Sequence, residues 1–345
     1  MSDPLLELVW KHDELADLEP ADRRLALRSL LADVVEADDV AREVERLANT
    51  IDGYGPITDL MDDEGVTDVL LNGYRDVWFE REGTIRRAPL RWDGDELDAF
   101  VERLLFQADV RADMAQPIAS GRLVDGSRVH VVLPPVSPTG PLVAIRRFPR
   151  RRLTMADLVE RGTISPAVSA ELSALVQRRM SLLISGATGT GKTTLLNALL
   201  GCIREDERVV TIEETAELQP SCPHWVPLVT REANVEGRGA VDQSTLVRAA
   251  LRLRPDRLVV GEVRGPEALA ALAALATGHE GSMLTVHARS GQDALHRMVS
   301  LALGGRSGAS EDALTEQVQR AFGAVVHLER DGEGRRRVAA ISYLS

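Results

Sequence analysis

The sequence predicts an α/β protein in which a parallel central sheet occupies the C-terminal half, preceded by a smaller α+β domain and a short helical leader. The apolar run at residues 181–184 leads into a glycine-rich stretch and then into helical apolar spacing at 194–200. From residue 208 onward, strand-like and helix-like segments alternate, as a parallel α/β sheet requires. The predicted divisions are a leader at 1–50, an α+β domain at 51–148, a helical linker at 149–180 and a parallel-sheet domain at 181–345.

Composition narrows the class of protein. The 345 residues are enough for two domains with ample cores, and no apolar stretch approaches the length that spans a bilayer. The two cysteines, Cys202 and Cys222, have neither zinc-site spacing nor a disulfide framework, which fits a reducing cytoplasm. The net charge of −12 argues against a protein whose main function is to bind nucleic acid.

The leader and the following domain differ in predicted secondary structure. Residues 3–50 predict two or three amphipathic helices with 13 acidic and 6 basic side chains, and a small bundle with a solvated acidic face is favoured over a docking device. Short apolar runs bounded by turn dipeptides such as Asp125-Gly126 then indicate strands. We expect strands at 66–72, 77–81, 85–90, 122–124, 127–133 and 142–148, and a helix at 95–110.

The linker at 149–180 is expected to carry two helices, at 155–161 and 165–179, with Thr154 and Ser165 as their N-cap candidates. Its opening belongs to the strongly basic run 146–152. That run has three possible roles: it binds anionic lipid or nucleic acid, it faces the phosphates of a bound nucleotide, or it is simply solvated surface.

The most informative stretch is the glycine-rich loop between the first predicted parallel strand and its helix. It matches G-x-x-x-x-G-K-[ST], the pattern of a phosphate-binding loop. In such a loop the backbone N–H groups and the helix N-terminus converge on an anion, Lys192 reaches the β- and γ-phosphates, and Thr193 ligates Mg²⁺. Lys192 is one of only two lysines among 41 basic residues. Nucleotide binding is predicted for Gly186, Ala187, Thr188, Gly189, Thr190, Gly191, Lys192, Thr193 and Thr194.

The segments after this loop supply the alternation that a parallel sheet needs. We expect strands at 208–212, 226–231, 258–263 and 282–287, helices at 242–253, 266–277, 291–303 and 311–322, and a final hairpin of 325–329 with 337–343.

Two of these strands end in carboxylates. Glu213 and Glu214 follow one apolar run, and Glu262 ends another, which is a Walker B arrangement with Glu in place of the usual Asp. Parallel neighbouring strands present such ends at the edge of the sheet that carries the phosphate loop. Because ATP hydrolysis needs carboxylates for the Mg²⁺ shell and for orienting water, the sequence predicts an ATPase.

Two histidines flank one predicted strand, His279 before it and His287 after it. A metal pair is conceivable, but no further ligand has matching spacing. A histidine in such a position is most commonly a core residue whose ring nitrogens have hydrogen-bond partners and no further role. A histidine that reports the state of the γ-phosphate is the more attractive interpretation here.

In their order these motifs resemble those of the type II/type IV secretion ATPases, and the resemblance runs from about residue 52 to the C-terminus. The phosphate loop resembles Walker A, 211–218 the Asp box, 231–239 the arginine-bearing segment, 253–265 Walker B, and 277–288 the His box. Within that superfamily, 125–128 and 145–148 resemble the N-terminal domain of the tight-adherence (Tad/Flp) pilus-assembly ATPases.

The resemblance implies a RecA-like P-loop NTPase domain that binds ATP and Mg²⁺ between two domains. It further implies a homo-hexameric ring in the cytoplasm, attached peripherally to the inner face of the cytoplasmic membrane. There the ring would contact platform proteins and drive pilus assembly, without direct contact with nucleic acid. Glu213 is the expected water activator and Glu262 the expected Mg²⁺-shell residue, although the two roles could be exchanged. Catalytic positions are Lys192, Glu213, Glu262, Arg231 and Arg238; further nucleotide contacts are Arg128, Arg146, Arg147, His279 and His287; the Mg²⁺ set is Thr193, Glu214 and Glu262, partly through water.

Two departures from the family pattern matter. Glu214 stands where the family commonly has Asp, and the tetracysteine zinc module of the type II branch is missing. Three alternatives to a pilus-assembly motor stay open: a conjugative DNA-transfer or type IV secretion ATPase, a retraction motor, and a nucleotide-gated scaffold with little hydrolysis.

Overall fold

A computed structural model describes residues 4–15, 17–81, 83–90, 92, 94–147, 152–231, 238–305 and 308–344. The chain divides into two compact units between residues 151 and 152. Each unit has hydrophobic cores of its own.

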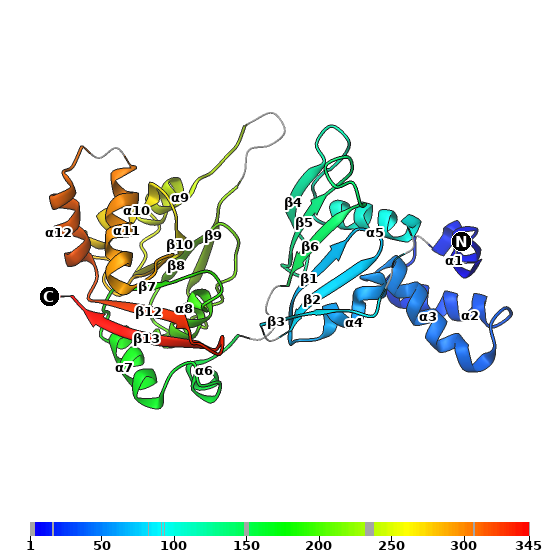
Figure 1. Cartoon of the computed structure of the whole chain (residues 1–345), viewed down its shortest axis with the longest axis horizontal. Helices are drawn as coiled ribbons and strands as arrows, with labels where there is room; N and C mark the ends of the chain where they lie inside the picture. Colours follow the sequence, from blue (N-terminus) through cyan, green and yellow to red (C-terminus); the bar gives the residue numbers. More distant parts are fainter. Residues whose placement is uncertain are drawn as a thin grey trace. The chain divides into compact units, whose positions relative to one another are not determined.

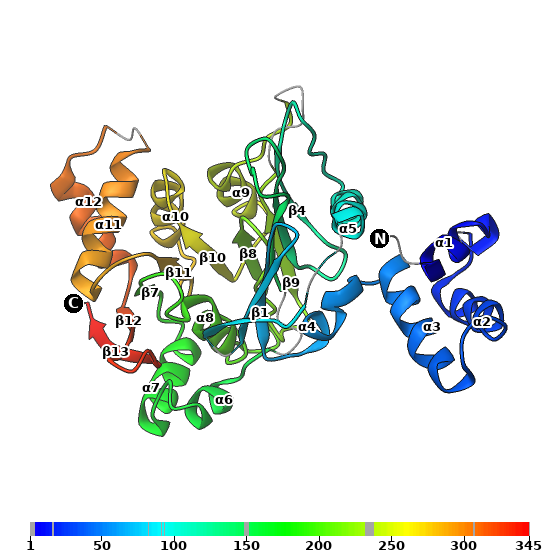
Figure 2. The same cartoon turned by 45° about the vertical axis from the view of Figure 1, so that its right-hand side comes forward.

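A small helical bundle opens the N-terminal unit (Figures 1 and 2). Leu27, Leu31 and Leu47 are fully buried in its core. Arg23 is also buried, where it donates to the Leu15 carbonyl at 2.6 Å and forms an ion pair with Asp52. The bundle comprises α1 (Pro4–Trp10), the 3-10 turn η1 (Asp13–Leu15), α2 (Pro20–Leu31) and α3 (Ala37–Ile51).

The rest of this unit is a six-stranded antiparallel sheet in the order β3-β2-β1-β6-β5-β4. Phe100 and Leu104 of α5 pack among buried sheet residues such as Val69, Val131 and Ile145. The elements are η2 (Gly55–Ile57), α4 (Thr58–Asp62), β1 (Val66–Asn72), β2 (Asp76–Arg81), β3 (Thr84–Arg87), α5 (Gly94–Gln107), β4 (Ile118–Arg122), β5 (Arg128–Val132) and β6 (Leu142–Arg146).

The hairpin around Asp125-Gly126 forms, but its first strand is β4 rather than the expected 122–124. Arg122 pairs with Arg128, and the Leu123 amide donates to the Ser127 carbonyl at 2.8 Å, so the chain is already turning at residue 123. Local sequence does not indicate this strand, because its middle, Ser120-Gly121, has weak strand propensity and no alternating apolar pattern; pairing with β5 holds it in place. The expected strand 85–90 is likewise shorter and spans 84–87.

The C-terminal unit is built on a seven-stranded sheet in the order β13-β12-β7-β11-β10-β8-β9. Every neighbouring pair is parallel except β12 and β13, which form an antiparallel hairpin at one edge (Figure 1). The strands are β7 (Leu182–Gly186), β8 (Val209–Glu213), β9 (Trp225–Val229), β10 (Arg257–Val263), β11 (Met283–Val286), β12 (Ala324–Arg330) and β13 (Arg336–Tyr343).

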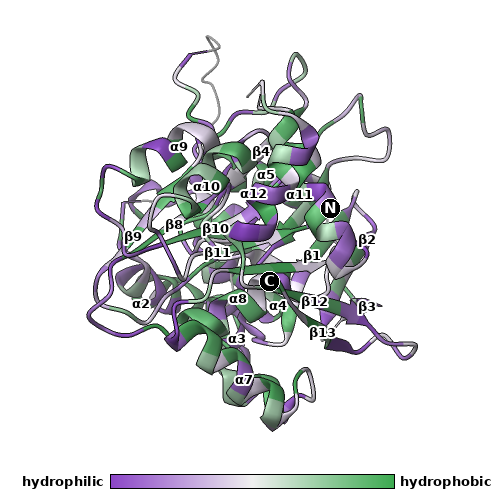
Figure 3. Cartoon of the chain, turned by 90° about the vertical axis from the view of Figure 1, so that its left-hand side faces the viewer, coloured by the Kyte–Doolittle hydropathy of each residue, from purple (hydrophilic) through white to green (hydrophobic). Residues whose placement is uncertain are grey.

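Helices cover both faces of this sheet, because alternate strand residues enter two different cores. Leu183 and Leu284 join the core shared with α9 to α12, whereas Leu182 and Ile184 join the core shared with α6 to α8. Figure 3 colours most of α7 as hydrophobic, with a few hydrophilic positions among them. The helices are α6 (Met155–Glu160), α7 (Pro166–Gln177), α8 (Lys192–Leu200), α9 (Gln243–Ala250), α10 (Glu267–Leu275), α11 (Gly291–Leu303) and α12 (Glu311–Ala321).

This architecture confirms the predicted fold class: a parallel α/β sheet with the phosphate loop after its interior strand β7, preceded by an α+β region and a helical leader. Among the described residues, no helix combines the length and the apolar character that a membrane crossing requires.

Candidate nucleotide-binding site

The phosphate loop joins the end of β7 to the start of α8, and two of its glycines are required by geometry. A side chain at Gly186 would place its Cβ 2.5 Å from the Leu328 carbonyl oxygen of β12. Gly191 caps α8 with φ of 95°, a left-handed conformation that other residues rarely adopt. The loop therefore reaches the N-terminus of α8 in the tight turn that exposes helix N–H groups to an anion.

Lys192 is the first residue of α8, and its ammonium group is held by three acceptors. The Nζ atom donates to the carbonyl oxygens of Gly186 and Ala187, both at 3.0 Å, and to Nδ1 of His287 at 3.1 Å. A lysine ammonium has three N–H donors, so all three are used. Only 7% of the residue is exposed. The cation thus lies under the loop, at its junction with the end of β11.

A chain of charged contacts leads away from Lys192 across the carboxyl edge of the sheet. Nε2 of His287 lies 2.7 Å from Oε1 of Glu262. Arg264 binds both oxygens of Glu262, at 2.7 and 3.0 Å, and reaches Oε2 of Glu214 at 2.7 Å. Residues from β11, β10 and the end of β8 therefore form one network with the phosphate loop.

Burial and neighbouring charges set the protonation states of this network. Burial, followed by the positive charge of Lys192, holds the pKa of His287 below its ordinary value. The neutral ring accepts from Lys192 at Nδ1, so its hydrogen lies on Nε2 and is donated to Glu262. Burial alone would raise the pKa of Glu262, but the hydrogen bond from Arg264 and the positive charges of Arg264 and Lys192 lower it overall. Burial also lowers the pKa of Lys192, against the opposing charge of Glu262.

Glu213 has a different environment from Glu262, although both lie at the carboxyl end of a strand. Its side chain is buried, and Oε1 accepts the backbone N–H groups of Glu217 and Leu218 at 2.9 and 3.0 Å. In this conformation the carboxylate turns toward the loop that follows β8 and is bound to its backbone N–H groups. Gly261 permits this, because a Cβ there would lie 2.9 Å from the Cγ atom of Glu213.

The oxygen donors at this edge fit a Mg²⁺ ion that arrives with a nucleotide. Thr193 follows Lys192 on the first turn of α8, and Glu262 is joined to Lys192 through His287. Mg²⁺ prefers hard oxygen ligands and combines one or two protein oxygens with phosphates and water. No group of three or more His, Cys, Asp or Glu side chains that could hold a metal ion alone occurs in the described part of the chain.

Three other predicted residues lie outside this network. The Arg231 guanidinium donates to the Gly239 carbonyl at 2.6 Å, and Arg238 is exposed, while residues 232–237 between them lie outside the described residues. His279 precedes β11 and contacts the Ala274 carbonyl oxygen at 3.0 Å, so it lies at the opposite end of that strand from His287. The structure brings His287 to the phosphate loop and does not bring His279 there.

The three predicted arginines of the N-terminal unit fall into two environments. Arg128 and Arg146 pair across β5 and β6 and share one face of the sheet. Arg147 is 9% exposed and donates to the carbonyl oxygens of Asp63 and, at 2.7 Å, Val66 at the start of β1. It therefore ties β6 to the loop before β1. Residues 148–151 of the basic run lie outside the described residues, and Arg152 donates to the Gln219 carbonyl.

Sequence reasoning missed the residue that links the two carboxylate strands, Arg264. It stands two positions after Glu262, so a search for cations beside the Walker B carboxylate would have found it. It also missed two arginines of the β12–β13 hairpin that lie against the phosphate loop, Arg330 and Arg336.

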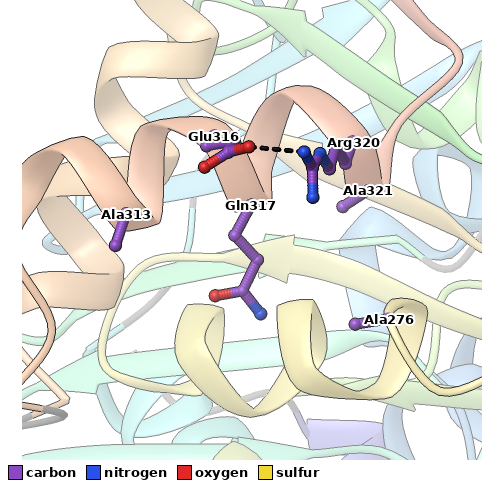
Figure 4. Close-up of a pocket in the computed structure, with 6 residues that line it drawn as sticks. All are labelled: Ala276, Ala313, Glu316, Gln317, Arg320 and Ala321. Atoms are coloured by element: carbon purple, nitrogen blue, oxygen red, sulfur yellow. Dashed lines mark ion pairs between the residues drawn. The ribbon is translucent and has the colours of Figure 1, made fainter.

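A surface depression of the C-terminal unit lies away from this site. It lies between α12 and the end of α10, and Glu316 pairs there with Arg320 at 2.5 Å (Figure 4). Since α10 runs from the carboxyl end of β10 to the start of β11, this depression is at the edge of the sheet opposite the phosphate loop. Its lining residues are Ala276, Ala313, Glu316, Gln317, Arg320 and Ala321.

Comparison with known families agrees with this geometry. The sequence profile of the family described as "Type II/IV secretion system protein" matches residues 50–328, which include the whole network. The chain belongs to this family.

Relatives of this secretion-family chain carry conjugation and type IV secretion names. A Mycobacterium tuberculosis protein provisionally named for conjugal transfer is 42% identical over 313 residues, covering 89% of this chain and 88% of the relative. The conjugal transfer protein TrbB of Rhizobium radiobacter is 34% identical, with 80% and 83% covered. VirB11 of Agrobacterium fabrum is 30% identical, with 81% and 89% covered. These relatives support the superfamily prediction and the conjugation and VirB11 side of it, and not specifically the tight-adherence branch.

Solved structures share the fold. The DotB ATPase of Yersinia pseudotuberculosis aligns with a TM-score of 0.60 at 15% identity, covering 90% of this chain and 80% of DotB. The DotB ATPase of Legionella pneumophila gives a TM-score of 0.57 at 19% identity, with 81% and 77% covered.

Proposed function

We propose that this chain is a Mg²⁺-dependent ATPase that works as a homo-hexameric ring in a conjugative or type IV secretion machine. The observation that carries the proposal is the network in which Lys192 of the phosphate loop is joined through His287 to Glu262. A phosphate-loop lysine and a carboxylate at a neighbouring strand end are parts that phosphoryl transfer uses, and here His287 connects the two. The conjugation and VirB11 names of the relatives favour this machine.

Nucleotide binding would exchange contacts that the network already makes. The backbone N–H groups at the start of α8 would hold the phosphates, and Lys192 would turn from His287 and the loop carbonyls to phosphate oxygens. Thr193 and Glu262 would hold a Mg²⁺ that accompanies the nucleotide, and the ion would supply positive charge to offset the charge that builds up on the phosphates. His287, released from Lys192, would then carry the change in phosphate occupancy to Glu262 and Arg264.

Glu262 and Glu213 have different surroundings, and these favour different roles for the two carboxylates. Glu262 is in contact with His287 and Arg264, close to where the terminal phosphate would lie beside Lys192. Glu213 would have to leave the N–H groups of Glu217 and Leu218 before it could orient a water molecule. We therefore assign the Mg²⁺ shell to Glu262 and a conformation-dependent role in water activation to Glu213.

The test is Mg²⁺-dependent phosphate release per subunit across a range of protein concentrations. Activity that rises with concentration is expected, because a ring completes its sites from neighbouring subunits. Lys192→Ala and Glu262→Gln should abolish release, and Lys11→Ala is a matched control because Lys11 is exposed and is the chain's only other lysine. If the wild type binds ATP but releases no phosphate at any concentration, the scaffold alternative replaces the motor.

A second candidate is the tight-adherence pilus motor, which is favoured by the segments at 125–128 and 145–148. In that role the ring would sit at the inner face of the cytoplasmic membrane against platform proteins. Deleting the gene separates the two machines: loss of plasmid or effector transfer with intact surface filaments supports the conjugative machine, and loss of filaments supports the pilus.

A further inference from the structure

The hairpin formed by β12 and β13 ends in two arginines that face each other. Arg330 is the last residue of β12, Arg336 is the first of β13, and the two are directly paired in the hairpin register. Paired residues of an antiparallel ladder project to the same face, with their Cβ atoms about 4.5–5.5 Å apart. Both side chains are exposed. The two guanidinium groups therefore project from the same face of the hairpin tip.

This tip lies against the phosphate loop. β12 runs parallel to β7 as far as the pair Leu328–Gly186, so the next two residues of β12 extend beside the loop that follows β7 (Figure 1). Nη2 of Arg330 donates to the Gly189 carbonyl at 3.1 Å. The side chain of Arg336 reaches the next glycine, since its Cδ atom is 3.6 Å from where a Cβ of Gly191 would stand.

The contact that Arg330 makes differs from the ion pairs of two neighbouring hairpin arginines. Arg335 is paired with Asp331 at 3.0 Å, and Arg337 with Glu329 at 2.6 Å. The Arg330 guanidinium instead donates to an uncharged carbonyl, and like charges directly opposite each other in a ladder are destabilising. A pair of cations held beside a loop built for phosphate is stabilised when an anion lies between them.

Sheet order fixes which part of a nucleotide would meet them. β11 and β10, which lead to His287 and Glu262, flank β7 on one side, whereas β12 and β13 flank it on the other. With its terminal phosphate by Lys192 and Glu262, a nucleotide that extends across the loop, away from β11 and β10, places its nucleoside end at the hairpin. We propose that Arg330 and Arg336 form a second anion subsite, which binds the α-phosphate at the nucleoside end of the nucleotide. This inference rests on the proposed function, because it takes the terminal phosphate to lie beside Lys192.

The test compares binding of ATP and of inorganic pyrophosphate, both with Mg²⁺, by the full-length chain. Pyrophosphate can fill the positions near Lys192 but lacks the nucleoside end. Arg330→Ala and Arg336→Ala should each raise the dissociation constant of ATP about tenfold or more, the loss expected for one charge-assisted hydrogen bond. The dissociation constant of pyrophosphate should change less than twofold. Arg337→Ala, on the same hairpin but paired with Glu329, is the matched control and should leave both unchanged.

Two results overturn the subsite. Unchanged ATP binding in both variants removes it, and an equal loss of ATP and pyrophosphate binding shows that the arginines only shape the loop. Failure of the proposed function itself is seen elsewhere, in wild-type protein that binds neither ligand.

Discussion

Arg257→Met should strongly destabilise the C-terminal unit, because it breaks a buried ion pair at the start of β10. Arg257 has no exposed surface, and its Nε and Nη2 atoms both bind the carboxylate of Glu207 at 2.8 Å. A third contact reaches the Gly281 carbonyl at 3.3 Å. Removing the arginine would leave Glu207, whose side chain is 6% exposed, with the half-exposed Arg179 at 2.8 Å.

The magnitude follows from that burial. Removing one partner of a buried pair costs about 3–5 kcal/mol, and the remaining contact with Arg179 points to the lower end, about 3 kcal/mol. At about 2–4 °C per kcal/mol, the melting temperature should fall by roughly 6–12 °C. Urea unfolding followed by circular dichroism measures the free energy of unfolding. The exposed pair of Arg337 and Glu329 is the control, and Arg337→Ala should cost at most about 1 kcal/mol.

Two further measurements separate a buried charge from lost packing. In the double variant Arg257→Met with Glu207→Leu no buried carboxylate remains, so most of the lost stability should return. The pKa of Glu207 is held low in the folded protein: burial raises it, but the hydrogen bond and charge of Arg257 and the charge of Arg179 lower it further. Its contribution is therefore complete above the unfolded pKa of about 4.3 and is lost as pH falls through the folded pKa. A single-variant loss below about 1 kcal/mol, or a double variant less stable than the single one, would refute this reasoning.

Three further changes test other contacts. Arg147→Ala should lower the unfolding free energy of the N-terminal unit by about 1.5–3 kcal/mol, because charged hydrogen bonds to carbonyls at the start of β1 are lost; an unchanged urea midpoint would contradict this. Gly261→Ala should cost about 1–3 kcal/mol, because the new methyl group meets the side chain of Glu213; a thermal melt equal to that of the wild type would show that the loop yields freely. Because the folded pKa of His287 is lowered by burial and by Lys192, its neutral form stabilises the fold above about pH 6.5, and this is lost as pH falls through the folded pKa. Urea titrations at pH 7 and pH 5 should therefore show a smaller loss of stability for His287→Gln than for the wild type, and equal losses would exclude this contribution.

Much of the fold could be predicted because its signals are local. The apolar run of β7, the glycines after it and the helical spacing of α8 are contiguous in the chain, and each reports its own backbone conformation. The misplaced strand β4 shows the limit. Ser120 and Gly121 are held in a strand by pairing with His130 and Val129 of β5, which local propensity does not register.

The candidate site divides in the same way. Lys192, Glu262 and His287 were predicted from motifs, and the structure brings them together. Arg147 belongs to a basic run in the sequence, yet its burial against β1 commits it to backbone carbonyls. Such a commitment depends on residues about eighty positions away, so no local pattern could reveal it.

The sequence by itself determined the phosphate loop, the carboxylates at the strand ends and the alternation that specifies a parallel sheet, because these depend on spacing along the chain. Only the tertiary structure decided which charges meet. Arg264 joins Glu262 to Glu214 because β10 pairs with β8, and Arg330 reaches Gly189 because β12 pairs with β7. The physical reason is that strand order sets distances between segments far apart in the chain, and the strength of electrostatic interactions depends on those distances and on burial.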